Sequence, residues 1–225
     1  MKRSAIIGAG MMGREIAIVY AKAGYQVALV DAAMELAQGA KEKIGEILDR
    51  DIKKGRMEES RKAEILAGIT PVSDRKQLAD YDFITEAVPE NFELKESIFK
   101  ELDGICKPET IFLSNTSTIS ITKLSQAVSQ ARKRRFLGTH YFSPASVMKL
   151  VEVIPGHLSD DDVVAKVATM MGELGKETVI VKDVPGFVVN RIYHVIMIEA
   201  LKLLEEGVAS VEDIDRACKF GMGHA

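Results

Sequence analysis

Apolar and polar residues follow two different patterns along the first 184 positions. Short apolar runs bounded by glycine, proline or charged residues are typical of buried strands, whereas longer stretches with apolar residues every three or four positions are typical of amphipathic helices. The runs that predict strands cover residues 4–7, 26–30, 69–72, 83–88, 111–113, 136–139, 148–154 and 178–181. The stretches that predict helices cover residues 16–23, 34–54, 57–67, 91–102, 119–128 and 160–175. This alternation predicts an α/β fold around a largely parallel sheet.

The pattern changes at the sequence Asp183-Val184-Pro185-Gly186, after which only helical stretches follow, over residues 187–206 and 211–220. We therefore predict a first domain over residues 1–184 and a second, all-α domain that begins at 185 and runs to 225. Two helices with this much apolar surface need further partners to bury it. We expect the C-terminal domain to be truncated in this chain, or to depend on oligomerisation.

The turn after the first predicted strand carries glycines at positions 8, 10 and 13. Gly8 permits a tight turn, Gly10 has no Cβ and lets a pyrophosphate approach the backbone, and Gly13 lets the following helix pack close to the sheet. The helix N-terminus offers unpaired N–H groups and a partial positive charge to phosphates. The predicted dinucleotide contacts in this turn are Gly8, Gly10, Met11, Met12 and Gly13. This motif is typical of a doubly wound α/β sheet that binds a dinucleotide.

An acidic residue, Asp31, ends the second predicted strand. A carboxylate at this place can accept hydrogen bonds from a ribose 2′-hydroxyl. Ala32 and Ala33 follow, with no arginine or lysine to bind a 2′-phosphate. The sequence therefore favours NAD over NADP as the cofactor.

The composition limits the other partners. A formal net charge of −3 argues against nucleic acid, and we expect the basic run at 132–135 to be a solvated turn before a strand. Cys106 and Cys218 have neither a metal-site spacing nor a disulfide framework, so we expect no metal and a reducing compartment. Glycines interrupt the apolar run near the N-terminus, and polar residues interrupt the stretch 187–204, so we expect neither a signal peptide nor a membrane span. These features predict a cytoplasmic protein.

Oxidation of a secondary alcohol by NAD needs a base for the hydroxyl proton. His140 is the best candidate, because it lies where a predicted strand gives way to a loop rich in polar and aromatic residues. Glu152 lies within an apolar strand, where a carboxylate is costly unless it is paired. Hairpin-like folding through 141–148 would bring Glu152 to His140 and fix the tautomer of its ring. Ser117 and Asn190 lie at element ends and could hold the substrate oxygen.

The helical pair at 34–54 and 57–67 is longer than a simple crossover needs. By itself the sequence favours a charged, exposed hairpin here. The alternative is an arm whose Lys53 and Lys54 meet a substrate phosphate.

Taken together, these motifs resemble the 3-hydroxyacyl-CoA dehydrogenases, including bacterial 3-hydroxybutyryl-CoA dehydrogenases. The resemblance covers the whole chain, in order, and rests on residues 8–13, 114–117, 140–144, 147–154 and 182–191. It implies a Rossmann-type domain with a helical hairpin arm, followed by a helical domain through which the full-length form makes a homodimer. It also implies the reversible, NAD-dependent oxidation of (3S)-3-hydroxyacyl-CoA to 3-oxoacyl-CoA in fatty-acid or butanoate metabolism.

The resemblance also implies roles for single residues. His140 would be the general acid/base, with Glu152 as its orienting partner, and Ser117 and Asn190 would bind substrate oxygens and help to position the nicotinamide. Further cofactor contacts would be Glu90, Lys95 and Asn115, and Lys54 would meet the CoA phosphates. Ser143 stands where the family motif most often has asparagine, a departure that bears on chain-length preference.

Two alternatives remain open at this stage. One is a 3-hydroxyacid dehydrogenase that acts on free acids, in which a lysine commonly serves as the acid/base. The other is an NAD-binding protein without turnover. The His140–Glu152 pair and Lys54 speak against the first alternative. The presence of His140, Glu152, Ser117 and Asn190 together speaks against the second.

Overall fold

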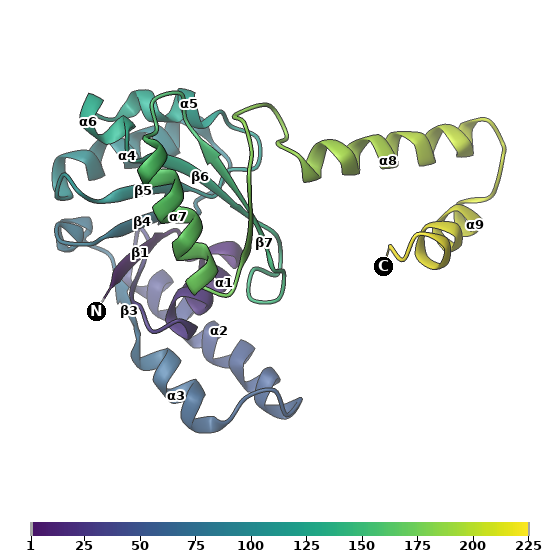
Figure 1. Ribbon diagram of the computed structural model, residues 1–225. Coiled ribbons are helices and arrows are strands. Elements are labelled where there is room, and N and C mark those ends of the chain that lie inside the picture. The colour runs from purple at the N-terminus through teal and green to yellow at the C-terminus, as the bar shows by residue number, and fades with distance from the viewer. Residues whose placement is uncertain (1, 225) are drawn as a thin grey trace. The chain divides into compact units, whose positions relative to one another are not determined.

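The computed structural model describes residues 2–224 and divides into two compact units, of which the first ends at Val184 and the second begins at Pro185. The first unit is built on an eight-stranded sheet with the order β3-β2-β1-β4-β5-β6-β7-β8 (Figure 1). Its strands are β1 (Arg3–Ile7), β2 (Gln26–Val30), β3 (Ile69–Val72), β4 (Phe83–Glu86), β5 (Ile111–Ser114), β6 (Phe136–Tyr141), β7 (Leu150–Pro155) and β8 (Glu177–Ile180). β1 to β6 are parallel, β7 pairs antiparallel with β6, and β8 runs parallel to β7. The predicted Rossmann-type α/β fold is confirmed.

The helices of the first unit follow the predicted order, with one additional short helix at 130–133, where a turn was predicted. They are α1 (Met11–Lys22), α2 (Met34–Lys53), α3 (Glu59–Ala67), α4 (Phe92–Ile105), α5 (Ile121–Leu124), α6 (Gln130–Lys133) and α7 (Asp161–Glu173), with 3₁₀ turns at Arg75–Leu78 and Ser125–Ala127. The prediction of one helix over 119–128 is wrong. Only the short α5 and a 3₁₀ turn form there: Ser120 caps α5 through the N–H of Lys123, so the helix begins at Ile121, and from Ser125 the chain continues as the 3₁₀ turn.

Helices cover both faces of the sheet. α1 and α7 pack on one face, in a continuous apolar cluster with alternate strand residues such as Leu29 and Leu113, and α7 is seen lying across the sheet in Figure 1. On the other face Phe99 of α4 packs edge-on against Phe136, with ring centroids 4.6 Å apart, and against Phe112 at 5.7 Å. Burial on both faces explains why these strands read as continuous apolar runs.

α2 and α3 form the predicted helical hairpin, which extends beyond the sheet in Figure 1. Ala37, Ala40, Ile44 and Leu48 are buried along one side of α2. Lys54 caps the C-terminus of α2 and is exposed on the arm.

The basic run at 132–135 is only partly the predicted solvated turn, since Arg134 is exposed but Arg132 and Lys133 are buried. The Arg132 guanidinium is buried and donates to the carbonyl oxygens of Cys106, Lys107, Pro108 and Thr110 and to Asp103. A guanidinium has five N–H donors, and here they satisfy the backbone of the turn before β5. Arg132 therefore stabilises the turn before β5 and is not available to bind a partner.

The second unit consists of α8 (Val189–Glu205), α9 (Val211–Arg216) and a π-helical turn over Ala217–Gly221. α8 begins two residues later than predicted, since Gly186 and Phe187 adopt left-handed backbone conformations at φ +73° and +48°. No residue of α8 is buried, and apolar side chains such as Ile192, Val195 and Leu201 are exposed. Among residues 2–224 no helix is both long enough and apolar enough to cross a membrane.

Candidate active site

The glycine turn joins β1 to α1 at the carboxyl edge of the sheet, where the strand order reverses between β1 and β4. Gly8 has φ +99°, and a Cβ there would lie 2.8 Å from the Ala87 carbonyl oxygen. A Cβ on Gly13 would lie 1.7 Å from the Gly8 carbonyl oxygen, so both glycines are required by packing. A Cβ on Gly10 would meet nothing within 4 Å. The space beside Gly10 therefore lies open in front of the first turn of α1, as a pyrophosphate site requires.

Asp31 follows β2 and holds this turn in place. Its Oδ2 accepts a hydrogen bond of 2.8 Å from the Ala9 N–H, and its Oδ1 accepts one of 2.7 Å from the Ala32 N–H. Each carboxylate oxygen can accept a second hydrogen bond. A ribose hydroxyl can therefore bind the same carboxylate that fixes the turn.

Glu90 organises the loop after β5. Its Oε1 accepts from the Thr116 hydroxyl at 2.5 Å, from the backbone N–H groups of Ser117 and Thr118 at 2.9 and 3.0 Å, and from the Thr118 hydroxyl at 2.9 Å. Burial by itself would raise the pKa of Glu90, but the Thr116 hydroxyl and the Lys95 ammonium outweigh burial and lower the pKa. Glu90 is thus an anion that fixes the backbone beside Ser117.

Lys95 is almost fully buried, with 1% of its surface exposed. Its Nζ lies 3.4 Å from Glu90 Oε2 and 3.2 Å from the Val88 carbonyl oxygen. Through these contacts Lys95 fixes the positions of the Glu90 carboxylate and the Val88 carbonyl group. The cofactor contact that the resemblance implies for Lys95 stays a prediction.

His140 and Glu152 face each other across the antiparallel pair β6–β7, where they are directly paired in register. His140 Nδ1 lies 2.7 Å from Glu152 Oε2, and both side chains are buried. The expected hairpin-like folding is therefore present, and His140 is the last residue but one of β6, next to the loop that follows. A strand position holds the imidazole more rigidly than a loop would.

Asn115 links the loop after β5 to the neighbourhood of His140. Its side-chain Oδ1 accepts a hydrogen bond of 2.9 Å from the N–H of Tyr141, the residue after His140, and its own N–H donates to the Glu86 carbonyl oxygen at 2.8 Å. The ring of Phe142 lies 4.7 Å from that of His140. The first unit thus brings the predicted residues Asn115, Glu90 and His140 to one edge of the sheet.

Two predicted site residues are not among the groups at the carboxyl ends of the strands. Asn190 belongs to α8 of the second unit, where it is half-buried, and Lys54 is exposed on the α2–α3 arm. Within residues 2–224 no group of three or more His, Cys, Asp or Glu side chains could hold a metal ion.

Two supporting residues escaped the sequence analysis. Asp183 accepts hydrogen bonds from the Thr122 N–H and the Ser120 hydroxyl, both at 2.8 Å, and so fixes the segment after Ser117. Burial opposes ionisation of Asp183, but these donors outweigh it and lower its pKa. Lys176 donates to the Ala145 and Met148 carbonyl oxygens in the loop that joins β6 to β7. The sequence offered two signals for these supporting roles. Asp183 stands just before the Pro185-Gly186 break, and Lys176 directly follows Gly175.

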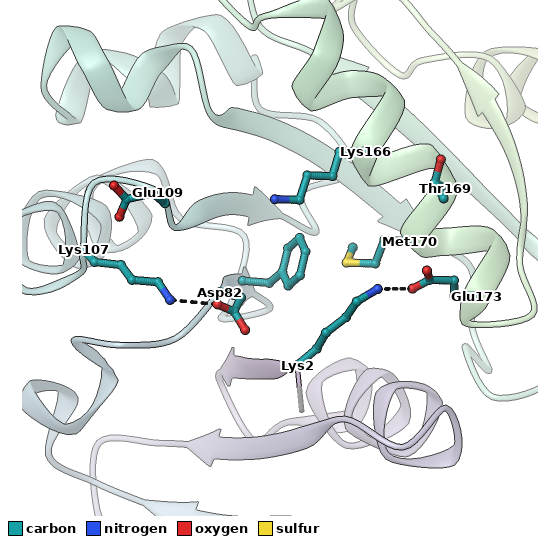
Figure 2. Close-up of a pocket in the computed structure, with 9 residues that line it drawn as sticks. Lys2, Asp82, Lys107, Glu109, Lys166, Thr169, Met170 and Glu173 are labelled. Carbon is teal, nitrogen blue, oxygen red and sulfur yellow. Dashed lines mark hydrogen bonds and ion pairs between the residues drawn. The ribbon is translucent and has the colours of Figure 1, made fainter.

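A separate cleft of about 460 Å³ lies at the opposite edge of the sheet, where β1 and β4 begin. Figure 2 shows two ion pairs among its charged side chains, Lys2 with Glu173 at 2.5 Å and Lys107 with Asp82 at 2.8 Å, and the cleft has neither a glycine turn nor a histidine in its lining. The candidate site is therefore the carboxyl edge, with its glycine turn and buried histidine.

Comparison with known proteins agrees with this arrangement. Residues 3–184 match the family model of the 3-hydroxyacyl-CoA dehydrogenase NAD binding domain, and residues 186–225 match that of the C-terminal domain. A 3-hydroxybutyryl-CoA dehydrogenase of Bradyrhizobium diazoefficiens is 39% identical over all of this chain and 76% of its own length. The mitochondrial hydroxyacyl-coenzyme A dehydrogenase of Sus scrofa is 38% identical over all of this chain and 73% of its own length. The crystal structure of the (S)-3-hydroxybutyryl-CoA dehydrogenase of Ralstonia eutropha superposes with a TM-score of 0.94 at 42% identity, covering all of this chain and 78% of that one.

Proposed function

The chain belongs to the 3-hydroxyacyl-CoA dehydrogenase family, and on this premise we propose which of its residues carry out the NAD-dependent oxidation of 3-hydroxyacyl-CoA to 3-oxoacyl-CoA. The observation that carries the proposal is the buried His140–Glu152 pair at the edge of the sheet that also bears the glycine turn. A base at this edge lies where doubly wound sheets bind their ligands.

The residues of the first unit fit NAD. The open space at Gly10 and the N-terminus of α1 suit the pyrophosphate, and Asp31 suits the adenosine ribose. Glu90 and Asn115 follow the strand ends nearer to His140 and suit the nicotinamide half of NAD. Lys95 is the third proposed contact of that half. When bound, NAD supplies the acceptor for the hydride that leaves C3 of the substrate.

His140 moves the proton. Glu152 accepts a hydrogen bond from Nδ1–H, which selects the tautomer in which Nε2 takes the proton of the substrate 3-hydroxyl. The carboxylate then stabilises the imidazolium that forms. In the reverse direction the same Nε2 returns the proton to the 3-oxo oxygen.

Ser117 and Asn190 complete the assignment by binding the substrate oxygens. Glu90 accepts a hydrogen bond from the N–H of Ser117 and so fixes the backbone of Ser117 just after the carboxyl end of β5. Lys54, exposed on the arm, is the proposed contact of the CoA phosphates. We further propose that the full-length form is a cytoplasmic homodimer.

The direct test is NADH oxidation with acetoacetyl-CoA, with longer 3-oxoacyl-CoAs and with free acetoacetate. Turnover of the thioester but not of the free acid is expected. His140→Gln should bind NADH as the wild type does and lose about 10²- to 10⁴-fold in turnover, as expected for a missing general acid/base. Equal turnover in this variant, or preference for the free acid, would overturn the assignment.

A further inference from the structure

We propose that Glu86, buried below the candidate site, is a positioning residue that sets the geometry of loop 114–118 through Lys95 and Glu90. The proposal rests on the proposed function, because it assigns that loop to the nicotinamide half of the cofactor. It concerns a residue that no step of the reaction uses directly.

Glu86 is the last residue of β4 and has no exposed surface. Its carboxylate accepts from Lys95 Nζ at 2.5 Å, from the Ser114 hydroxyl at 2.6 Å and from the Val88 N–H at 2.7 Å. Burial raises the pKa of Glu86, while the Lys95 ammonium acts against this effect. A buried carboxylate with three donors holds those donors in fixed positions, because moving any of them leaves the buried charge with one hydrogen bond fewer.

Lys95 is shared between two carboxylates at unequal distances. Its Nζ lies 2.5 Å from Glu86 Oε1 and 3.4 Å from Glu90 Oε2. The shorter contact keeps the ammonium near β4, so that the ion pair with Glu90 is the longer of the two.

Glu90 uses its other oxygen for the loop. Oε1 receives all four hydrogen bonds from Thr116, Ser117 and Thr118, whereas Oε2 faces Lys95. If Glu86 lost its charge, Glu90 would be the remaining carboxylate beside a buried ammonium. Lys95 and Glu90 would then approach each other, and Oε1 would be drawn away from the N–H of Ser117.

A second buried ion pair of the same unit separates this role from stability alone. Arg132 Nε lies 3.0 Å from Asp103 Oδ1, with both side chains largely buried. Asp103 lies near the C-terminal end of α4, whereas Lys95 lies near its N-terminal end. Asp103→Asn therefore weakens a buried pair without reaching the loop after β5.

The experiment compares Glu86→Gln with Asp103→Asn by calorimetric titration with NADH and by thermal unfolding. Glu86→Gln should weaken NADH binding about tenfold, the effect of losing one charge-assisted contact. Asp103→Asn should lower Tm about as much as Glu86→Gln does. It should change NADH binding by less than about twofold, because Asp103 is distant from the loop after β5. A milder variant, Ser114→Ala, removes one donor to Glu86 without stranding a charge. It should weaken binding about threefold by the same reasoning, and it serves if Glu86→Gln does not fold.

A double-mutant cycle decides whether Glu86 acts through Glu90. In the Glu90→Gln background, Glu86→Gln should change NADH binding by less than about twofold, since coupled residues are not additive. Fully additive effects, or equal NADH binding by Glu86→Gln and Asp103→Asn, would overturn the inference. Failure of the wild type to bind NADH would instead overturn the proposed function.

Discussion

Gly10→Ala is expected to leave the fold intact and to weaken NADH binding. Gly10 is the N-cap of α1, with φ −66° and ψ −167°, a conformation open to any L-residue. The added Cβ would meet no protein atom within 4 Å. The methyl group would instead occupy the space through which the pyrophosphate reaches the first turn of α1.

The two effects differ in size. Replacing glycine by alanine at an N-cap costs up to about 1 kcal/mol, which lowers Tm by about 2–4 °C in a chain of this size. A pyrophosphate held off the helix N-terminus loses at least one hydrogen bond to a charged group, worth about 1.5–3 kcal/mol. The expected loss of NADH affinity is therefore about 10- to 100-fold.

Gly13→Ala provides the contrast. Its Cβ would lie 1.7 Å from the Gly8 carbonyl oxygen, so α1 and the turn would have to separate. Overpacking of this kind costs about 1–3 kcal/mol or more. We expect Gly13→Ala to lower Tm well beyond the effect of Gly10→Ala.

The assay is calorimetric titration with NADH together with thermal unfolding of each variant. Gly39→Ala in α2 is the matched control, since its Cβ would also meet nothing within 4 Å and the position is remote from the turn. It should bind NADH normally and gain about 0.5–1 kcal/mol of stability. Wild-type NADH affinity in Gly10→Ala would refute the placement of the pyrophosphate.

Three further predictions concern Glu152, Asp183 and the two cysteines. Glu152→Gln should keep NADH binding but lower turnover by at least about tenfold, because the tautomer of His140 is no longer fixed; an unchanged rate would contradict the role of the pair. The pKa of Asp183 is lowered in the folded state, so its contribution to stability is complete above its ordinary value of 3.8 and is lost as the pH falls through the folded pKa. The difference in Tm between the wild type and Asp183→Asn, measured by thermal unfolding, should thus become smaller as the pH falls. A difference in Tm that stays the same at every pH would contradict this. Burial raises the pKa of the Cys106 thiol to about 11, so in titration with a thiol reagent near neutral pH the half-buried Cys218 should react first; equal rates in the native protein would exclude this difference.

The part of the site that could be predicted from the sequence is built from residues that lie close together along the chain. The strand, glycine turn, helix and second strand that end at Asp31 follow one another within 31 residues, and each has a short-range signal. The pairing of His140 with Glu152 was also predictable, because a carboxylate inside an apolar strand needs a partner and one hairpin brings the two together.

The features that escaped prediction depend on groups far apart in the chain. Asp183 reaches Ser120 across 63 positions, and this contact accompanies the short α5 where the periodicity predicted a longer helix. Arg132 is buried because carbonyl oxygens of residues 106–110 surround its guanidinium. Neither set of partners leaves a periodic trace in the sequence.

The same carboxylates that are proposed to contact the cofactor also hold the backbone of the site. Asp31 accepts from the N–H of Ala9 in the glycine turn, and Glu90 accepts from the N–H groups of Ser117 and Thr118. Each anchor comes from a different element than the loop it holds, so the loops are positioned before a cofactor arrives, which lowers the cost of binding. It follows that substitution of Asp31 or Glu90 changes loop order and cofactor contact together. Only variants at a distance from the cofactor, such as Glu86→Gln, can separate the two contributions.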